Sequence, residues 1–261
     1  MRYNPKLPDE GINSKDSTFF HDFLKYSVQL FATLLILVVA ANFIVDFAIS
    51  HLSVESEKYL AKKLHLEGFY NAKKSKYLSK VATRLYACSN LPYDVNISII
   101  NEESPNAFAA AGGEIFVTQG LLDKVQSENE LSFVIGHELG HFKHRDHLKA
   151  VGHNIIFQSI GSLLGFESNG GVNLFLNFGN SLYSQKAELQ ADLYGLDMME
   201  CAYGNAVDTL SFFEKMDDKQ SWKYIGATHP DFGKRIANLK REIQKRGLDT
   251  RAKPVKLKPF Y

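Results

Sequence analysis

The sequence predicts a mostly helical α+β fold with a small β-sheet, preceded by one transmembrane helix. A long apolar run fills residues 27–49, two short segments alternate in polarity, and most other apolar residues recur at helical spacing. With 261 residues, of which 45% are hydrophobic, the chain can bury the core of one domain of ordinary size. We therefore expect a polar N-terminal arm, a transmembrane helix, a folded domain and a basic tail, at residues 1–26, 27–49, 53–250 and 251–261.

The apolar run from Ser27 to Ile49 is about long enough to cross the hydrocarbon core of a bilayer at about 1.5 Å per residue. A cleaved signal peptide has a shorter apolar core nearer the start of the chain, whereas a polar arm of about 25 residues precedes this run. The competing interpretation is a buried helix of a soluble core. It is favoured only by Asn42 and Asp46, since a carboxylate is costly at membrane depth. We therefore predict a single-pass membrane protein, held in the lipid bilayer by this run.

The charges of the chain exclude one class of partner. Lys+Arg 30 against Asp+Glu 29 give a formal net charge of +1, so no global field would hold a phosphate backbone, and nucleic acid is not expected as a partner. Basic residues flank the apolar run on both sides, so the charge bias leaves the side of the membrane that holds the domain open. The two cysteines, Cys88 and Cys201, form either one disulfide or two free thiols, and their number is too small for a disulfide framework.

Two strands are predicted in the first half of the domain. Residues 94–100 (DVNISII) and 114–118 (EIFVT) alternate in polarity and are rich in β-branched residues. We expect a loop between them and take 114–118 as an exposed edge strand. Helical spacing of apolar residues predicts helices at 53–66, 75–89, 183–200, 205–217 and 231–246.

A helix with a strong start signal is predicted in the middle of the chain. Ser127 and Glu130 have the spacing of a capping box before an apolar run, so this helix is expected to begin near Glu128 and to continue to about His147. The apolar stretch at 154–182 is interrupted by glycines and offers no second membrane span. It predicts a helix hairpin or a flap over a functional site.

The same helix carries the HExxH pattern, His137-Glu138-Leu139-Gly140-His141. The i, i+4 spacing puts both imidazoles on one helix face, where two nitrogens can share one zinc ion. Glu138 projects beside them and can take a proton from a water that zinc acidifies. A predicted strand precedes the helix, and an extended peptide can pair with a strand edge, which is the arrangement that a peptidase needs.

Catalytic zinc needs a third protein ligand and an open position, and the sequence offers two candidates for the ligand. His147 lies ten residues after His137, the spacing of the metzincin pattern, but that pattern also wants a glycine where this chain has His144. Glu188 lies on a separate predicted helix, with Asp192 one turn later on the same face. We favour Glu188 as the ligand, with Asp192 accepting the outer N–H of a ligand histidine.

From about Asn106 onward, the chain resembles the zinc metallopeptidase family of HtpX, BepA and the type-I CAAX prenyl proteases. The resemblance rests on ordered motifs: Pro105-Asn106-Ala107-Phe108, Gly112-Gly113 with the strand that follows, His137 to His141, Glu188 to Asp192, Thr228-His229-Pro230 and Arg235-Ile236. It implies a gluzincin, or zincin-like, metallopeptidase domain and one Zn²⁺ ion per chain. The ligands that it implies are His137, His141 and Glu188, with Glu138 as the general base. The implied substrates are misfolded or membrane polypeptides in protein quality control.

The resemblance extends the expected site to four further residues. His229 and Arg235 are expected to approach the active site, where His229 binds the metal in a resting state or stabilises the oxyanion, and Asn106 and Gly113 are expected to bind the substrate backbone. The resemblance also points to a bacterial inner membrane, although HtpX and the prenyl proteases cross the membrane several times and this chain offers one span. The rival interpretation is a non-hydrolytic or latent chaperone-like module in which His229 closes the zinc site. The oligomeric state stays open.

Overall fold

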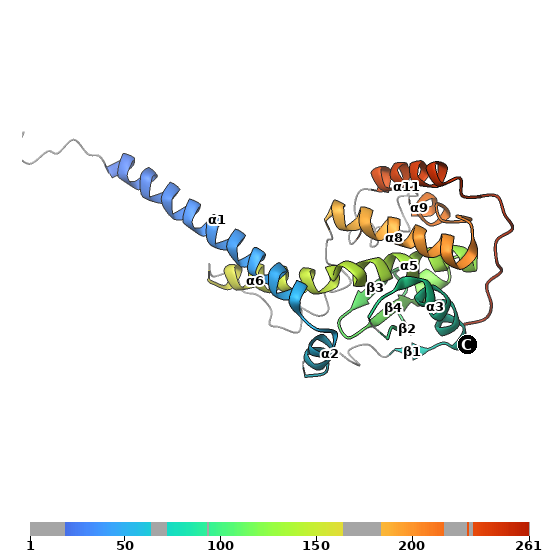
Figure 1. Cartoon of the computed structure of the whole chain (residues 1–261). Coiled ribbons are helices and arrows are strands. Elements are labelled where there is room, and N and C mark those ends of the chain that lie inside the picture. Colours follow the sequence, from blue (N-terminus) through green and yellow to red (C-terminus); the bar gives the residue numbers. More distant parts are fainter. Residues whose placement is uncertain are drawn as a thin grey trace, which may run out of the picture. The chain divides into compact units, whose positions relative to one another are not determined.

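The computed structural model describes residues 19–63, 72–92, 94–163, 184–216, 229 and 232–260 (Figure 1). The chain divides into two compact units, Met1–Ile44 and Val45–Tyr261. The first unit holds most of helix α1, and the second holds the end of this helix and the other described helices and strands.

Helix α1 (Phe19–His51) contains the predicted transmembrane run and extends beyond it at both ends. Its 33 residues would measure about 50 Å at about 1.5 Å per residue, more than a hydrocarbon core requires. No residue of this fully described helix is buried, which argues against a core helix of a soluble protein. Its two polar residues have partners, since Asn42 donates to the carbonyl of Val38 (2.8 Å) and Asp46 lies 3.0 Å from Nε2 of His153. By length and composition, α1 fits a membrane anchor.

The described sheet has four short strands in the order β1-β2-β4-β3. Strand β4 pairs in parallel with β2 and antiparallel with β3, so it is an inner strand. The strands predicted at 94–100 and 114–118 are therefore confirmed, but the prediction that 114–118 forms the edge is wrong. The strands are β1 (Lys73–Lys74), β2 (Asn96–Ile100), β3 (Ala107–Ala110) and β4 (Glu114–Thr118).

Strand β3 forms the edge beside β4 instead, and its sequence does not reveal it. Its residues, Ala-Phe-Ala-Ala, include no β-branched side chain, so local propensity is low. The chain reverses after β3 in a turn through Gly112 and Gly113, whose φ angles of +91° and +89° favour glycine. Pairing with β4 across this turn, rather than propensity, makes the segment a strand.

Four of the five helices predicted by spacing match described helices to within about three residues, whereas the helix predicted at 205–217 is shorter, at Ser211–Met216, and the helix Gln119–Leu122 was not expected. The helix that carries HExxH, α5, also ends early. This helix was expected to continue to His147, but it ends at His144 because Arg145 adopts a φ of +56° and donates its N–H to the carbonyl of Phe142 (3.0 Å). Of the predicted hairpin or flap at 154–182, residues 154–163 belong to α6 and the rest lie outside the described residues. The helices are α2 (Val54–Lys63), α3 (Lys76–Ser89), α4 (Gln119–Leu122), α5 (Glu128–His144), α6 (Asp146–Leu163), α8 (Gln185–Tyr203), α9 (Ser211–Met216) and α11 (Phe232–Arg246).

Helices α5 and α8 lie side by side at the centre of the domain, with the sheet on the other side of α5 (Figure 1). Their backbones touch, because a Cβ on Gly140 would lie 2.7 Å from Cα of Ala191. Glycine at this position therefore permits the approach of the two helices. This packing brings the HExxH pattern against the face of α8 that carries Glu188 and Asp192.

Two long-range contacts close the fold around this helix pair. A disulfide between Cys88 and Cys201 joins α3 to α8 and settles the cysteine pairing that the sequence left open. The C-terminal segment packs on the domain: Val255 exchanges backbone and side-chain hydrogen bonds with Glu128 and Asn129 at 2.9 and 2.8 Å, and the ring of Phe260 contacts Tyr77. The described part of the expected basic tail is therefore attached to the start of α5.

Candidate active site

The start of the HExxH helix α5 is capped. Ser127 is the N-cap and accepts from the N–H of Glu130 (3.1 Å), and the Glu130 carboxylate accepts from the N–H of Gln126 (2.8 Å). The predicted capping box is therefore present, but the Glu130 carboxylate accepts from the N–H of Gln126 and not from that of the N-cap, Ser127. Ten residues after Ser127 comes His137, which is buried on the same helix face as His141, with their Nε2 atoms 3.1 Å apart.

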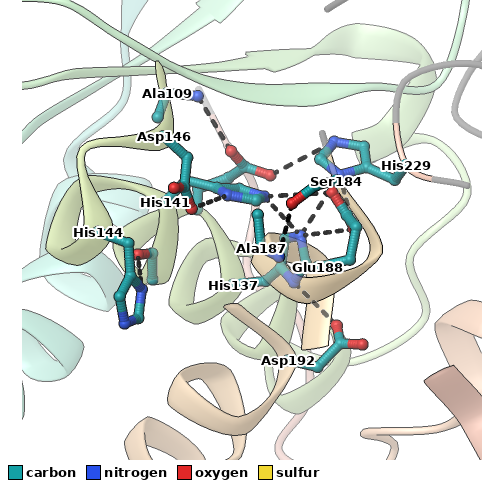
Figure 2. A network of polar contacts seen from close by, with 12 residues as sticks. Ala109, His137, His141, His144, Asp146, Ser184, Ala187, Glu188, Asp192 and His229 are labelled. Atoms are coloured by element: carbon teal, nitrogen blue, oxygen red, sulfur yellow. Dashed lines mark hydrogen bonds and ion pairs between the residues drawn. The ribbon is translucent and has the colours of Figure 1, made fainter. Parts of the chain in front are cut away.

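Helix α8 brings a carboxylate to the same point. Ser184 caps its start by accepting from the N–H of Ala187 (3.2 Å), which sets Glu188 in the first turn (Figure 2). The Glu188 carboxylate is fully buried, and its oxygens lie 3.6 Å from Nε2 of His137 and 3.6 Å from Nε2 of His141.

His229 completes the cluster from a distant part of the chain. Its Nδ1 lies 3.0 Å from Glu188 Oε1 and 3.4 Å from Nε2 of His137. Burial lowers the pKa of His229, but the charge and hydrogen bond of Glu188 and the charge of Glu138 outweigh this, so the pKa is raised. His137, His141, Glu188 and His229 each offer one ligand atom, and these atoms lie within 4.8 Å of one another. Imidazole nitrogens with one carboxylate are the donors that zinc prefers, so these residues fit a zinc ion.

A carboxylate holds the outer nitrogen of each HExxH histidine. Asp192 Oδ1 lies 2.9 Å from Nδ1 of His137, and Asp146 Oδ2 lies 3.2 Å from Nδ1 of His141 (Figure 2). Such partners fix the tautomer and leave Nε2 directed at a metal. Burial lowers the pKa of His141, while the hydrogen bond and charge of His141 outweigh burial and lower the pKa of Asp146.

The sequence did not predict that Asp146 contacts His141, because the HExxH helix was expected to continue past residue 146. An acidic residue five positions after His141 points elsewhere on a continuous helix. The break at Arg145 starts a new helix and turns Asp146 back toward the imidazole.

Arg235 lies behind the cluster and balances its charge. Its guanidinium donates to both oxygens of Asp192 at 2.6 and 2.8 Å and lies 2.6 Å from Glu188 Oε2. Burial raises the pKa of Glu188, but the charge and hydrogen bond of His229 and the charges of His137 and Arg235 outweigh it, so the pKa is lowered. Burial raises the pKa of Asp192 as well, but the charge and hydrogen bond of Arg235 outweigh burial, so this pKa is also lowered. The structure thus brings Arg235 to Glu188 and Asp192 of α8.

Glu138 lies between the cluster and the edge strand. It is buried, its Oε2 accepts from the N–H of Ala109 in β3 (3.0 Å), and its Oε1 lies 3.9 Å from Nε2 of His229. A carboxylate that can act as a base is therefore next to the backbone with which a peptide could pair.

The two residues expected to bind substrate lie at opposite ends of β3. Asn106 precedes the strand, donates its N–H to Thr118 Oγ1 (2.8 Å) and lines a small, mainly apolar pocket beside Glu138. Gly113 lies in the turn after the strand, and its carbonyl accepts from the N–H of Asn96 (2.8 Å). Asn106 therefore lies next to the cluster, whereas Gly113 lies at the far end of the hairpin. The pocket is also lined by Phe133, Val134, Phe212 and Phe213.

His147, the alternative ligand, faces a different residue. Its Nε2 lies 3.0 Å from Glu57 Oε1, and it is not a member of the cluster among the described side chains. Because α5 ends at His144, His147 belongs to the next helix, α6, and not to the helix that carries HExxH.

The fold and the site together define a class. An HExxH helix packed against a second helix that carries a glutamate, with a small sheet beside them, is the arrangement of a gluzincin metallopeptidase. The chain belongs to peptidase family M48, which its residues 72–243 match, and this confirms the resemblance and the fold class predicted from the sequence. M48 metallopeptidases use zinc, in agreement with the donor set.

Similar proteins agree with this family. The chain is 33% identical over 177 residues to the mitochondrial metalloendopeptidase OMA1 of Schizosaccharomyces pombe, covering 62% of this chain and 51% of that protein. It is 30% identical over 191 residues to the metalloprotease LoiP of Escherichia coli, covering 68% and 74%. It is 38% identical over 105 residues to the HtpX protease homolog of Campylobacter concisus, covering 35% and 36%. The chain thus spans about half the length of the first of these relatives.

Proposed function

We propose that this protein is a membrane-anchored, zinc-dependent metalloendopeptidase that hydrolyses peptide bonds in polypeptides. The observation that carries the proposal is the convergence of two histidines from α5 and a glutamate from α8, next to Glu138 and an edge strand. In this proposal His137, His141 and Glu188 hold the zinc ion, and Asp192 orients His137. Bound zinc supplies a Lewis acid that polarises a carbonyl and acidifies water.

The protein's own groups perform the proton transfers in this mechanism. Glu138 takes a proton from the attacking water and gives it to the nitrogen of the leaving amine. The substrate pairs with β3, where Asn106 and the β3–β4 hairpin with Gly113 hold its backbone. His229 stabilises the oxyanion of the tetrahedral intermediate when substrate is bound. Arg235 acts as a positioning residue, because it contacts Glu188 and Asp192.

The alternative of a non-hydrolytic or latent module is not favoured. It would need His229 to close the zinc site permanently as a fourth ligand. A general base beside the metal is needed for hydrolysis but not for a closed zinc site, and the relatives are named as metalloendopeptidases or proteases. We propose misfolded or membrane proteins as substrates, since α1 would hold the site near a membrane.

Cleavage of unfolded casein by the full-length protein in detergent tests this function. We expect cleavage that stops when a chelator removes the metal and returns when about one equivalent of zinc per chain is added. The measurement is the appearance of new peptide ends together with zinc content. Intact casein at one bound zinc per chain would contradict the proposal.

We further propose that the domain faces an oxidising compartment, such as the outer side of a bacterial inner membrane. Structural disulfides persist in such compartments and are rare in the cytosol, and the Cys88–Cys201 disulfide lies within the domain. Alkylation of the denatured protein from intact cells should modify neither cysteine before reduction and both after it. Two thiols that react before reduction would place the domain on the reducing side.

A further inference from the structure

The mechanism above does not use a buried pair outside the metal cluster, Glu57 and His147. Glu57 lies on α2 and is 1% exposed, and His147 lies in the first turn of α6 and is 0% exposed. His147 Nε2 lies 3.0 Å from Glu57 Oε1. Because a buried carboxylate is costly unless it accepts hydrogen bonds, the groups that it contacts are held in place.

A second contact of Glu57 is with the turn between the edge strand and β4. The N–H of Gly112 donates to the same oxygen, Oε1, at 3.1 Å. Ala61, one helical turn after Glu57, lies so close that a Cβ on Gly112 would come within 3.3 Å of its methyl group. Helix α2 therefore holds this turn by a hydrogen bond and by direct packing.

This turn also fixes the edge strand, β3, relative to Glu138, the proposed base. Ala110 pairs with Glu114 next to the turn, and Ala109 pairs with Ile115. The N–H of Ala109 does not point at β4 but donates to Glu138 Oε2 at 3.0 Å. Since so few residues separate Gly112 from Ala109, a displaced turn would change the distance between the edge of β3 and Glu138.

His147 ties Glu57 to the helix that carries HExxH. Its ring packs edge-on against Phe142 of α5, with ring centroids 4.6 Å apart. Within the described part of the chain its Nδ1 has no hydrogen-bond partner, so Glu57 is its polar contact. His147 therefore fixes Glu57 relative to α5 and α6, and Glu57 in turn binds the β3–β4 hairpin.

We propose that Glu57, oriented by His147, is a positioning residue for peptide binding. It fixes the β3–β4 turn and so sets the space between the edge strand and Glu138 in which the substrate backbone lies. The inference rests on the proposed peptidase function and deepens it. Only Leu52 and Ser53 separate α2 from α1, so the helix that follows the membrane anchor is the one that holds the substrate strand.

Steady-state cleavage of an unfolded polypeptide by the full-length protein in detergent tests this role. Glu57→Ala should raise KM by about 10-fold or more, because the turn loses a buried acceptor, with kcat changed by less than about threefold. Glu57→Gln should restore KM to near the wild-type value, since its amide oxygen can accept the same N–H. Zinc content should stay at the wild-type level in both variants.

A matched control is Glu130→Ala, which removes an equally buried carboxylate at the start of α5. Glu130 accepts hydrogen bonds from Lys215 and from the N–H of Gln126. Its loss therefore removes comparable contacts, but at the start of α5 and away from the β3–β4 hairpin. Its KM should stay near the wild-type value. An unchanged KM in Glu57→Ala, an equal rise in Glu130→Ala, or loss of zinc in Glu57→Ala would each overturn the proposal.

Hydrogen exchange of the zinc-loaded proteins separates this proposal from the peptidase function. Amides of residues 107–118 should exchange faster in Glu57→Ala than in wild type or Glu130→Ala, while those of α8 should not change. If no protein cleaves the substrate, the peptidase function fails, and exchange alone decides whether Glu57 positions the hairpin. Equal exchange at 107–118 in all three proteins would refute it.

Discussion

Replacement of Glu138 by glutamine should lower kcat for peptide hydrolysis by about 10²- to 10⁴-fold, the range that a positioned acid–base group supplies. Glutamine has nearly the same shape, and its amide oxygen can still accept from the N–H of Ala109, as the carboxylate does at 3.0 Å. It cannot take a proton from water at neutral pH. The loss should therefore fall on kcat, measured in steady-state assays with casein or a peptide.

Zinc content distinguishes this outcome from a damaged site. Glu138 is not among the four side chains that converge on the metal position, so the variant should bind as much zinc as wild type. Substrate affinity should also change little, because the β3 edge keeps its place. A Glu138→Gln protein that retains more than about a tenth of wild-type kcat would exclude the residue as the base.

The parts of the site that lie within one helix are predictable from sequence, because helical periodicity is local. The spacing of His137 and His141 requires only 3.6 residues per turn, and the capping signal at Ser127 marks where the helix begins. Glu188 and Asp192 follow the same rule on α8. Their meeting with α5 is tertiary, and sequence points to it through the HExxH pattern and the family resemblance.

The features that sequence did not give depend on contacts between distant segments. Strand β3 exists through its pairing with β4, although its alanines have little strand preference. Asp146 reaches His141 only because a non-glycine residue, Arg145, takes a positive φ, which no local signal announces. The Cys88–Cys201 bond joins residues 113 positions apart, and two cysteines alone cannot show whether they meet.

Replacement of Glu188 by alanine should release the metal. Its carboxylate is the only acidic member of the described cluster, so the variant leaves only the imidazoles of that cluster to hold a divalent cation. Loss of a partner that merely orients a ligand lowers metal affinity by about 10- to 100-fold, and loss of a ligand should exceed this. Asp192→Asn should therefore weaken zinc binding less than Glu188→Ala does. The measurement is the zinc content per chain after gel filtration.

The expected loss of zinc need not come from unfolding, because Arg235 keeps both its bonds to Asp192 when Glu188 is gone. Thermal unfolding of each zinc-free protein checks that the fold persists. His147→Ala provides the decisive contrast: His147 contacts Glu57 rather than the cluster, so this variant should keep its zinc. If His147→Ala lost the metal and Glu188→Ala retained it, the metzincin spacing would describe the site and Glu188 would be no ligand. If both variants kept a full equivalent of zinc, His229 would be the third ligand, since it is the remaining donor of the cluster.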